Sequence, residues 1–254
     1  MIELRHIEKS YGEKKVLSEI SLSIRQGEMV ALIGANGAGK STLLKVISGA
    51  LPAQGKALIE GRKIRRIAAA QRAGIIAVVP QEIPSTIPLR GYEFVMLGRT
   101  HRLPRFGAPS AADCEAVERA MASTGTGAFK DRFLSDMSGG ERQRLAVAIA
   151  FAAEPRIILL DEATSHLDLN HRVEIMQLLR KMNRDQGVTI LMAVHDLMLA
   201  SRFFDRLILL QEGKVIQDAA PPAVLKEDIL EGAYGCRIRT IQLPDELGTC
   251  VVPV

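Results

Sequence analysis

A glycine-rich loop near the start of the chain carries the strongest chemical signal in the sequence. Its eight residues follow the pattern G-x-x-x-x-G-K-S and come directly after the apolar run Met29 to Ile33. A loop with few side chains lets backbone N–H groups converge on phosphate oxygens. The lysine reaches the β- and γ-phosphates of a nucleotide, and the serine hydroxyl suits Mg²⁺. The predicted phosphate site consists of Gly34, Ala35, Asn36, Gly37, Ala38, Gly39, Lys40 and Ser41.

Two adjacent carboxylates follow a second apolar run, Ile157 to Leu160. Alone, Asp161 and Glu162 are equally well explained as solvated acids at a strand end. Beside a phosphate loop they acquire separate roles. Asp161 holds Mg²⁺ directly or through water, and Glu162 orients and deprotonates the attacking water. The carboxyl edge of a parallel sheet, where we expect both, is where such sheets bind ligands.

The stretch Ser138-Gly139-Gly140-Glu141 allows two explanations. A capping box accounts for the serine and the glutamate, three residues apart, but not for the glycines. Each glycine in a first helical turn costs about 1 kcal/mol relative to alanine, which indicates that something approaches this backbone closely. A bare helix N-terminus binds phosphate, and the glycine-rich loop already provides one such site. The second site is therefore predicted to serve a nucleotide held by another copy of the chain.

Gln81 and His195 each follow an apolar run, Ile75 to Val79 and Thr189 to Val194. Taken alone, each is more often structural than functional. As polar groups at strand ends near a nucleotide, both become candidate contacts of the γ-phosphate.

The elements that position these residues alternate between short apolar runs and helical spacing. The five runs, with Leu207 to Leu210 as the fifth, predict central strands covered on both faces. Ser41 to Ser48 and Arg172 to Arg184 have helical spacing, so a largely parallel α/β sheet is predicted. Before Gly27 we expect an antiparallel sheet, and from about Ile83 to Ala153 a helical insertion. Its segments are Leu4 to Ser10, Val16 to Ile20 and Leu22 to Ile24 for the sheet, and Ala111 to Ser123 and Glu141 to Ala153 for the helices.

Composition limits the function only weakly. The chain has 254 residues and a formal net charge of +4, too small an excess to argue for nucleic acid as a partner. No apolar run is long enough to cross a bilayer, and the first residues lack the core of a secretory signal, so a cytoplasmic protein is expected. Cys114, Cys236 and Cys250 are predicted to be reduced thiols.

Together these motifs resemble the ATP-binding subunits of ABC transporters over nearly the whole chain. Gly34 to Thr42 resemble Walker A, Leu160 to Glu162 Walker B, and Ser138 to Glu141 the signature motif. Tyr11 resembles the aromatic residue that stacks on adenine, Gln81 the Q-loop, Ser165 to Asp168 the D-loop and His195 the switch histidine. The chain departs from the family's commoner residues at Met137, Glu141 and Ala163. None of these departures removes a group that contacts phosphate.

The resemblance implies a single ATPase domain over residues 1–254, with its core in 1–85 and 154–254 and a helical insertion with the signature motif in 86–153. It implies an α/β P-loop core, an N-terminal antiparallel β subdomain, and two copies that bind two ATP molecules head to tail. The roles it implies are catalysis for Glu162, His195 and Gln81; ATP binding for Tyr11, the phosphate loop and Thr42; Mg²⁺ binding for Ser41, Gln81 and Asp161; and contact with the partner copy's ATP for Ser138, Gly139, Gly140, Glu141 and Asp168.

Three segments resemble importers of metal chelates, meaning iron-siderophores, haem or cobalamin. They are Gly91 to Arg99, Thr164 to His171 and Val224 to Arg237. This resemblance implies transmembrane permease subunits and a substrate-binding protein as partners, and a place on the cytoplasmic face of the membrane. The alternatives are an importer of free metal ions, a soluble ABC-type ATPase of translation or DNA repair, and a P-loop kinase or GTPase. The basic clusters Arg62 to Arg66 and Arg99 to Arg105 are expected to be solvated faces, and the second is also a candidate contact of a partner.

Overall fold

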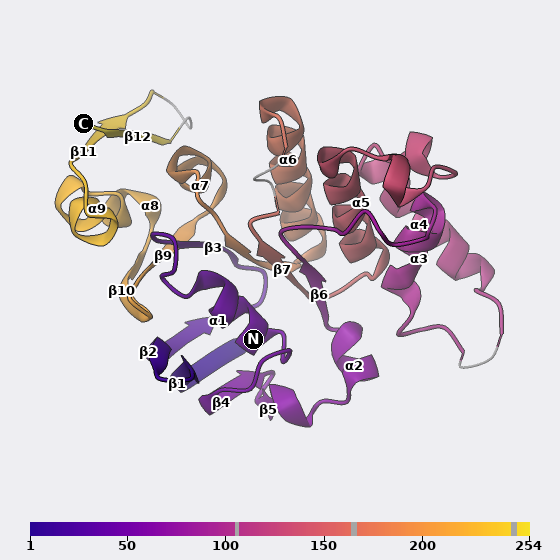
Figure 1. The fold of residues 1–254 in the computed structure, drawn as a ribbon, viewed down its shortest axis with the longest axis horizontal. Helices are drawn as coiled ribbons and strands as arrows, with labels where there is room; N and C mark the ends of the chain where they lie inside the picture. Colours follow the sequence, from indigo (N-terminus) through magenta and orange to yellow (C-terminus); the bar gives the residue numbers. More distant parts are fainter. Residues whose placement is uncertain (105–106, 164–166, 245–247) are drawn as a thin grey trace. The chain divides into compact units, whose positions relative to one another are not determined.

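The structure is a computed structural model, which describes residues 1–104, 107–163, 167–244 and 248–254. The chain divides into two compact units, one formed by residues 1–67 with 189–254 and the other by residues 68–188 (Figure 1). Antiparallel strands, a mainly parallel set of strands and a group of helices are all present, as the sequence predicts. None of the helices in the described ranges is long and apolar enough to span a membrane.

The first unit opens with an antiparallel sheet in the order β2-β1-β4-β5. The second strand is continuous, although the sequence suggests two segments. A register shift lies near Glu19, which has φ of 53°, and this irregularity changes the spacing of buried residues from three, at Leu17 and Ile20, to two afterwards. The strands are β1 (Ile2–Tyr11), β2 (Lys14–Ile24), β4 (Gln54–Ile59) and β5 (Arg62–Lys63).

The same unit contains the strand that leads into the phosphate loop. All five residues of β3 (Met29–Ile33) are buried, which explains its uninterrupted apolar sequence. It pairs in parallel with β8 (Thr189–Ala193) on one side and β9 (Arg206–Gln211) on the other. β10 (Lys214–Ala219) pairs antiparallel with β9 through a two-residue turn at Glu212 and Gly213, both with positive φ. The predicted strands at these three runs are confirmed.

Helices and a terminal hairpin complete the first unit. The sequence predicts the helix that follows the phosphate loop. It does not predict the hairpin at the C-terminus. Ser201 Oγ accepts a hydrogen bond of 2.8 Å from the Thr249 N–H, which ties this hairpin to α7. The elements are α1 (Lys40–Ile47), α7 (Leu197–Phe203), α8 (Pro221–Val224), α9 (Glu227–Tyr234), β11 (Ile238–Gln242) and β12 (Thr249–Pro253).

The second unit has two parallel strands and a group of helices, and its predicted strands and helices are confirmed. Val79 of β6 is in register with Leu160 of β7, so both strands end at the same edge. The elements are α2 (Ala69–Ala73), β6 (Ile76–Val79), α3 (Gly91–Met96), α4 (Ala111–Ser123), α5 (Gly139–Ala152), β7 (Ile157–Asp161) and α6 (Leu169–Gln186).

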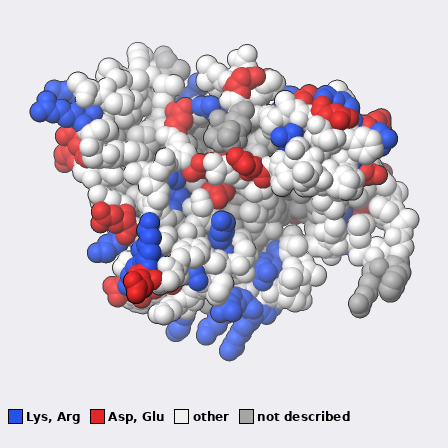
Figure 2. All heavy atoms as spheres, in the orientation of Figure 1, with Lys and Arg blue, Asp and Glu red and all other residues white. Residues whose placement is uncertain are grey.

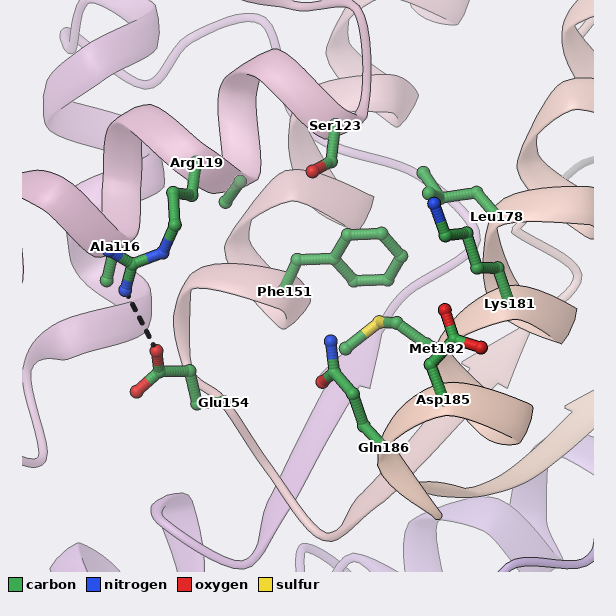
Figure 3. Close-up of a pocket in the computed structure, with 11 residues that line it drawn as sticks. Ala116, Arg119, Ser123, Phe151, Glu154, Leu178, Lys181, Met182, Asp185 and Gln186 are labelled. Atoms are coloured by element: carbon green, nitrogen blue, oxygen red, sulfur yellow. Dashed lines mark hydrogen bonds and ion pairs between the residues drawn. The ribbon is translucent and has the colours of Figure 1, made fainter.

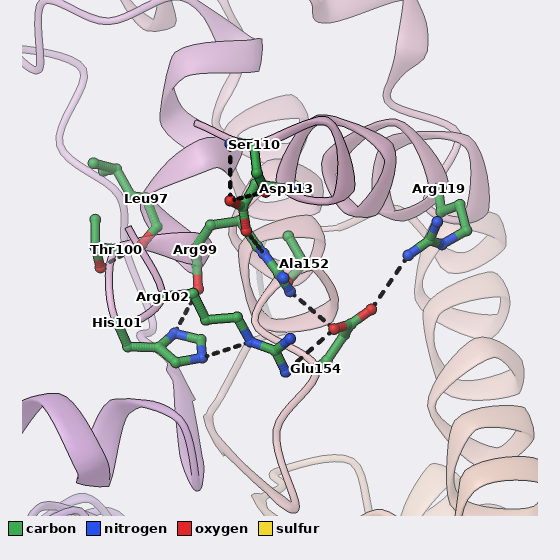
Figure 4. A network of polar contacts seen from close by, with 11 residues as sticks. Leu97, Arg99, Thr100, His101, Arg102, Ser110, Asp113, Arg119, Ala152 and Glu154 are labelled. Carbon is green, nitrogen blue, oxygen red and sulfur yellow. Dashed lines mark hydrogen bonds and ion pairs between the residues drawn. The ribbon is translucent and has the colours of Figure 1, made fainter. Parts of the chain in front are cut away.

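A buried arginine joins the helices of the second unit (Figure 4). Arg99 is 2% exposed, and its Nε donates a hydrogen bond of 2.9 Å to Asp113 Oδ1 at the start of α4. Its Nη1 donates to the Ala152 carbonyl at 2.7 Å and to Glu154 Oε2 at 2.9 Å. One guanidinium therefore holds the ends of α4 and α5 together, which gives Arg99 a structural role rather than the solvated one predicted for its cluster.

Candidate functional site

Two glycines of the phosphate loop are required by the packing around them. Gly34 has φ of 142°, and a Cβ there would lie 2.1 Å from the Leu210 carbonyl oxygen. Gly39 has φ of 105°, and a Cβ there would meet Leu17 at 2.8 Å and the Val16 carbonyl at 3.0 Å. Neither position tolerates another residue without moving backbone. Strands β2 and β9 thus fix the shape of the loop from outside it.

The phosphate loop is open at its tip, at Gly37, and buried at its end, at Lys40. Gly37, with φ of 82°, has no atom within 4 Å of the place its Cβ would occupy, so a ligand can approach its backbone. Lys40 is almost completely buried at the first turn of α1, and its Nζ donates hydrogen bonds to the Gly34 and Ala35 carbonyls at 2.8 and 3.2 Å. The positive end of α1 and this ammonium group lie at one loop, which is an arrangement suited to phosphate.

Tyr234, which lies in the segment Val224 to Arg237, contacts the phosphate loop, and the sequence did not predict this contact. The Gly34 N–H donates a hydrogen bond of 3.1 Å to the Tyr234 hydroxyl oxygen, at the C-terminal end of α9. Burial raises the pKa of Tyr234 to about 12, so the phenol stays protonated at neutral pH. The two residues are 200 positions apart, which is why spacing could not reveal the contact.

Two further predicted residues of the first unit have positions that fit a nucleotide site. The Val194 N–H donates to the Leu32 carbonyl at 3.0 Å, so the end of β8 lies beside the end of β3. His195 follows Val194 directly and is exposed at the edge where the phosphate loop begins. Tyr11, at the end of β1, is 49% exposed, and the Lys9 ammonium lies over its ring at 5.4 Å from the centroid.

In the second unit the carboxylate pair and Gln81 lie at one sheet edge. Asp161 ends β7, and both it and Glu162 are half-buried; Gln81 is exposed two residues after β6. Glu162 has φ of 52°, in the left-handed region that side-chain-bearing residues rarely adopt. Such a conformation costs about 1 to 3 kcal/mol and is concentrated at functional sites. The chain has the same conformation at Glu19, Glu60, Glu154 and Glu212, so the position of Glu162 directly after Asp161, rather than its backbone, marks it as a candidate.

Both explanations of the Ser138 stretch find support at the start of α5. The capping box is complete, because Ser138 Oγ accepts from the Glu141 N–H at 3.2 Å and Glu141 Oε2 accepts from the Ser138 N–H at 2.7 Å. That hydrogen bond from the Ser138 backbone, followed by one from Arg132, lowers the pKa of Glu141. A Cβ at Gly139 would meet nothing within 4 Å, so this chain's own packing does not require the glycine.

The loop after β6 is attached to the start of α5. Gln143 Nε2 donates to the Pro80 carbonyl at 2.9 Å, and Arg142 Nε donates to the Ile83 carbonyl at 3.1 Å. A hollow of about 310 Å³ lies between them, with Gln81 and Gly139 in its lining. Two motifs that are far apart in the sequence, the Gln81 loop and the Ser138 stretch, are therefore neighbours within the second unit.

The positions of Asp168 and Ser165 neither support nor contradict their predicted roles. Asp168 is exposed and caps α6, where its Oδ1 accepts from the His171 N–H at 2.9 Å. Ser165 lies outside the described residues. Another hollow, of about 300 Å³ between α4, α5 and α6, is lined by Phe151, Met182 and Lys181 among others (Figure 3). It contains none of the predicted site residues.

Comparison with known proteins gives a consistent result. Residues 17–165 match the model of the ABC transporter family. The hemin import ATP-binding protein HmuV of Burkholderia thailandensis is 34% identical, with all of both chains covered. The ferric enterobactin transport ATP-binding protein FepC of Escherichia coli K12 is 36% identical over 96% of this chain and 90% of its own.

A solved structure supports the same assignment. The dimeric ATP-binding cassette MJ0796, in a post-hydrolysis state bound to ADP and Pi, is 32% identical. It superposes with a TM-score of 0.78, covering 87% of this chain and 99% of that one. Because the family match spans more than half of the sequence and the relatives align over nearly all of it, the chain belongs to the ABC transporter family of ATP-hydrolysing proteins.

Proposed function

We propose that the chain is the ATP-hydrolysing subunit of a membrane importer that takes up a metal chelate: an iron-siderophore, haem or cobalamin. The observation that carries this proposal is a phosphate loop fixed by its surroundings in a chain that aligns from end to end with a hemin import ATP-binding protein. The ferric enterobactin relative, at similar identity, supports the wider class of iron chelates rather than haem alone. The importer's permease and substrate-binding protein are its expected partners, and the cytoplasmic face of the membrane its expected place.

The proposed ATP site uses the residues of the phosphate loop and Thr42, with Tyr11 stacked on adenine. Lys40 exchanges its bonds to the Gly34 and Ala35 carbonyls for bonds to the β- and γ-phosphates. Glu162 orients the attacking water and accepts its proton, while His195 and Gln81 contact the γ-phosphate. The position of Glu162 directly after β7 and the exposed position of His195 support these roles.

Mg²⁺ is the metal that this donor set fits. Ser41, Gln81 and Asp161 offer a hydroxyl, an amide and a carboxylate oxygen, which are hard ligands. Among the described residues, no group of three or more His, Cys, Asp and Glu could hold a metal by itself. Mg²⁺ is usually held by one or two carboxylates together with phosphate oxygens and water, and Asp161 is the carboxylate of this set. When bound, Mg²⁺ neutralises charge on the phosphates.

The active form is proposed to be a head-to-tail dimer. Ser138, Gly139, Gly140, Glu141 and Asp168 of one copy then complete the ATP site of the other. The open space at Gly139 supports this arrangement, since it leaves the first turn of α5 accessible to the partner's nucleotide. The related cassette MJ0796 is dimeric in its post-hydrolysis state with ADP and Pi.

The test is uptake by proteoliposomes that contain the permease encoded beside the chain, its binding protein and this subunit. We expect ATP-dependent uptake of one chelate class, among ferric siderophores, haemin and cobalamin, and none of free Zn²⁺ or Mn²⁺. Glu162→Gln should lower uptake and hydrolysis at least 100-fold, because it removes the base. Glu174→Gln, the same change at an exposed position of α6, is the control and should leave both unchanged.

Two results would overturn the proposed function. Uptake of free metal ions without chelate uptake would assign the chain to the neighbouring importer class. Recovery of the chain with ribosomes or DNA, rather than with permease-containing membranes washed in about 0.5 M salt, would assign it to a soluble ATPase class. The high-salt wash matters because electrostatic contact with lipid alone is screened beyond a few ångströms there.

A further inference from the structure

The positive charge of the chain is concentrated in one short segment. Residues 54–66 contain five of the 33 Lys and Arg residues and one of the 29 Asp and Glu residues. The other residues therefore carry 28 basic and 28 acidic groups, and the whole formal net charge of +4 lies in this segment. The basic surface, as we call it, consists of Lys56, Arg62, Lys63, Arg65 and Arg66.

A tight hairpin presents these side chains. Ile59 of β4 is in register with Arg62 of β5, so only Glu60 and Gly61 form the turn. Both have positive φ, 52° and 75°, as a type I′ turn requires. A single 3₁₀ turn at Ile64–Arg66 follows, with Ile64 buried beneath it. The charges are thus fixed on a folded edge of the antiparallel sheet rather than spread along a loose loop.

Four of the five cations line one hollow. Lys56, Lys63, Arg65 and Arg66 surround a space of about 310 Å³ whose apolar wall includes Ile7, Val46 and Leu51. Figure 2 shows the blue atoms gathered over β4 and β5, at the lower edge of the view. Like charges that face a common hollow repel one another, and an apolar wall weakens the screening by water. An anion placed there relieves that repulsion.

Among the residues that the structure describes, no acid forms an ion pair with these cations. Within the part of the chain that the structure describes, none of the five basic side chains has a carboxylate within 4 Å. Nearby acids are engaged elsewhere, since Glu3 pairs with Arg5 at 2.6 Å and Glu8 with Lys15 at 2.8 Å. The cations of the basic surface are therefore available to an external anion, contrary to the purely solvated face that the sequence favours.

We propose that the basic surface binds the anionic phosphate headgroups of a lipid bilayer. Clusters of four to eight Lys and Arg residues beside membrane spans or on amphipathic helices bind anionic lipids, and each basic residue near an anionic membrane contributes about 1 kcal/mol. We extend this behaviour to a cluster on a hairpin. Nucleic acid is the less suitable partner, because single-stranded bases need aromatic side chains to stack on and residues 54–66 contain none. This contact requires neither cargo nor permease, so it can fail independently of the proposed function.

The test is flotation of the purified chain with vesicles at about 0.05 M salt, where surface charges still interact across a Debye length of more than 10 Å. We expect binding to vesicles of phosphatidylcholine with phosphatidylglycerol and none to phosphatidylcholine alone. The triple variant Lys63→Gln, Arg65→Gln, Arg66→Gln should bind about 100-fold more weakly. Binding of the parent chain should also disappear at about 0.5 M salt.

A matched variant shows whether vesicle binding depends on the basic surface itself or only on the net charge of the chain. Lys214→Gln, Lys226→Gln, Arg237→Gln removes the same three charges from exposed positions of the same unit and should bind like the parent. Equal loss in both triple variants would overturn the proposal. So would displacement of the chain from vesicles by inorganic phosphate at the lipid phosphate concentration, which would indicate a free-phosphate site.

Two measurements complete the experiment. ATP hydrolysis should be the same in both triple variants and the parent, and an unchanged melting curve confirms that the first variant is folded. If that variant proves unfolded, Arg65→Gln and Arg66→Gln made singly should each weaken binding about fivefold. Binding of an RNA hairpin that depends on the same residues, without vesicle binding, would replace the lipid by nucleic acid and overturn the proposal.

Discussion

The hydroxyl of Tyr234 accepts the backbone N–H of Gly34, the first glycine of the phosphate loop. The Leu210 carbonyl packs closely against Gly34, and the Gly213 N–H donates to the Ala38 carbonyl at 3.1 Å. Residues from the C-terminal third of the chain thus brace the loop at both ends. The backbone amides of the loop converge on phosphate only when the loop has the right shape. Losing one of these contacts is therefore expected to lower the affinity for ATP more than the turnover number.

Tyr234→Phe removes one hydrogen bond and keeps the ring. We expect the KM for ATP to rise about two- to tenfold, the equivalent of one lost hydrogen bond of about 0.5 to 1.5 kcal/mol, with kcat within about twofold of the parent. Steady-state hydrolysis measures both. Tyr92→Phe, in α3 of the other unit, is the matched control and should change neither. An unchanged KM in Tyr234→Phe, or an equal change in the control, would show that the hydroxyl does not position the loop.

At the scale of single residues, the sequence predicts those site residues that lie close together in one motif. The order of Gly34, Gly39 and Lys40 is enough to predict a phosphate loop, and its strand and helix are confirmed. Tyr234 escapes prediction because its contact depends on the tertiary fold. The strain at Glu162 also escapes, since nothing in the residue type predicts a left-handed backbone.

Among the helices, α4 begins with a charged group at its cap. Ser110 Oγ donates to Asp113 Oδ2 at 2.6 Å, and Arg99 Nε donates to Oδ1. These two bonds, in that order of importance, lower the pKa of Asp113 to about 2, whereas an unfolded chain has an aspartate pKa of about 3.9. The ionised form therefore stabilises the fold above about pH 4, and this contribution is lost as the pH falls towards 2.

Asp113→Asn keeps the shape of the side chain and removes its charge. We expect a lower free energy of unfolding at pH 7, because the buried Arg99 loses a partner, and a gap from the parent that narrows between pH 4 and pH 2. Urea unfolding at several pH values measures the gap. Glu115→Gln, on the exposed face of the same helix, should change stability by less than about 1 kcal/mol. A gap in Asp113→Asn that is constant with pH would contradict the assigned role of the carboxylate.

Elements with strong periodicity are the ones that the sequence predicts well. The buried strands β3, β7 and β8 each contain at least four consecutive apolar residues, and α4 begins and ends at the predicted residues. The hairpin of β11 and β12 was not predicted, because short strands with mixed exposure owe their pairing to tertiary contacts such as that of Thr249 with Ser201. At α5, the sequence could not separate a cap from a ligand site, since both use Ser138 and Glu141.

At the scale of the whole molecule, formation of a dimer that depends on ATP tests the proposed shared site. In Glu162→Gln, ATP is bound but not cleaved, so we expect a stable dimer in size-exclusion chromatography with ATP and Mg²⁺, and a monomer with ADP. Adding Ser138→Arg places a bulky cation where open space at Gly139 admits the partner's nucleotide. That double variant should stay monomeric yet bind ATP within about threefold of the single one. Ser123→Arg, at the end of α4, is the control for an added charge and should leave the dimer intact. A dimer that survives Ser138→Arg would show that the start of α5 does not contribute to the shared site.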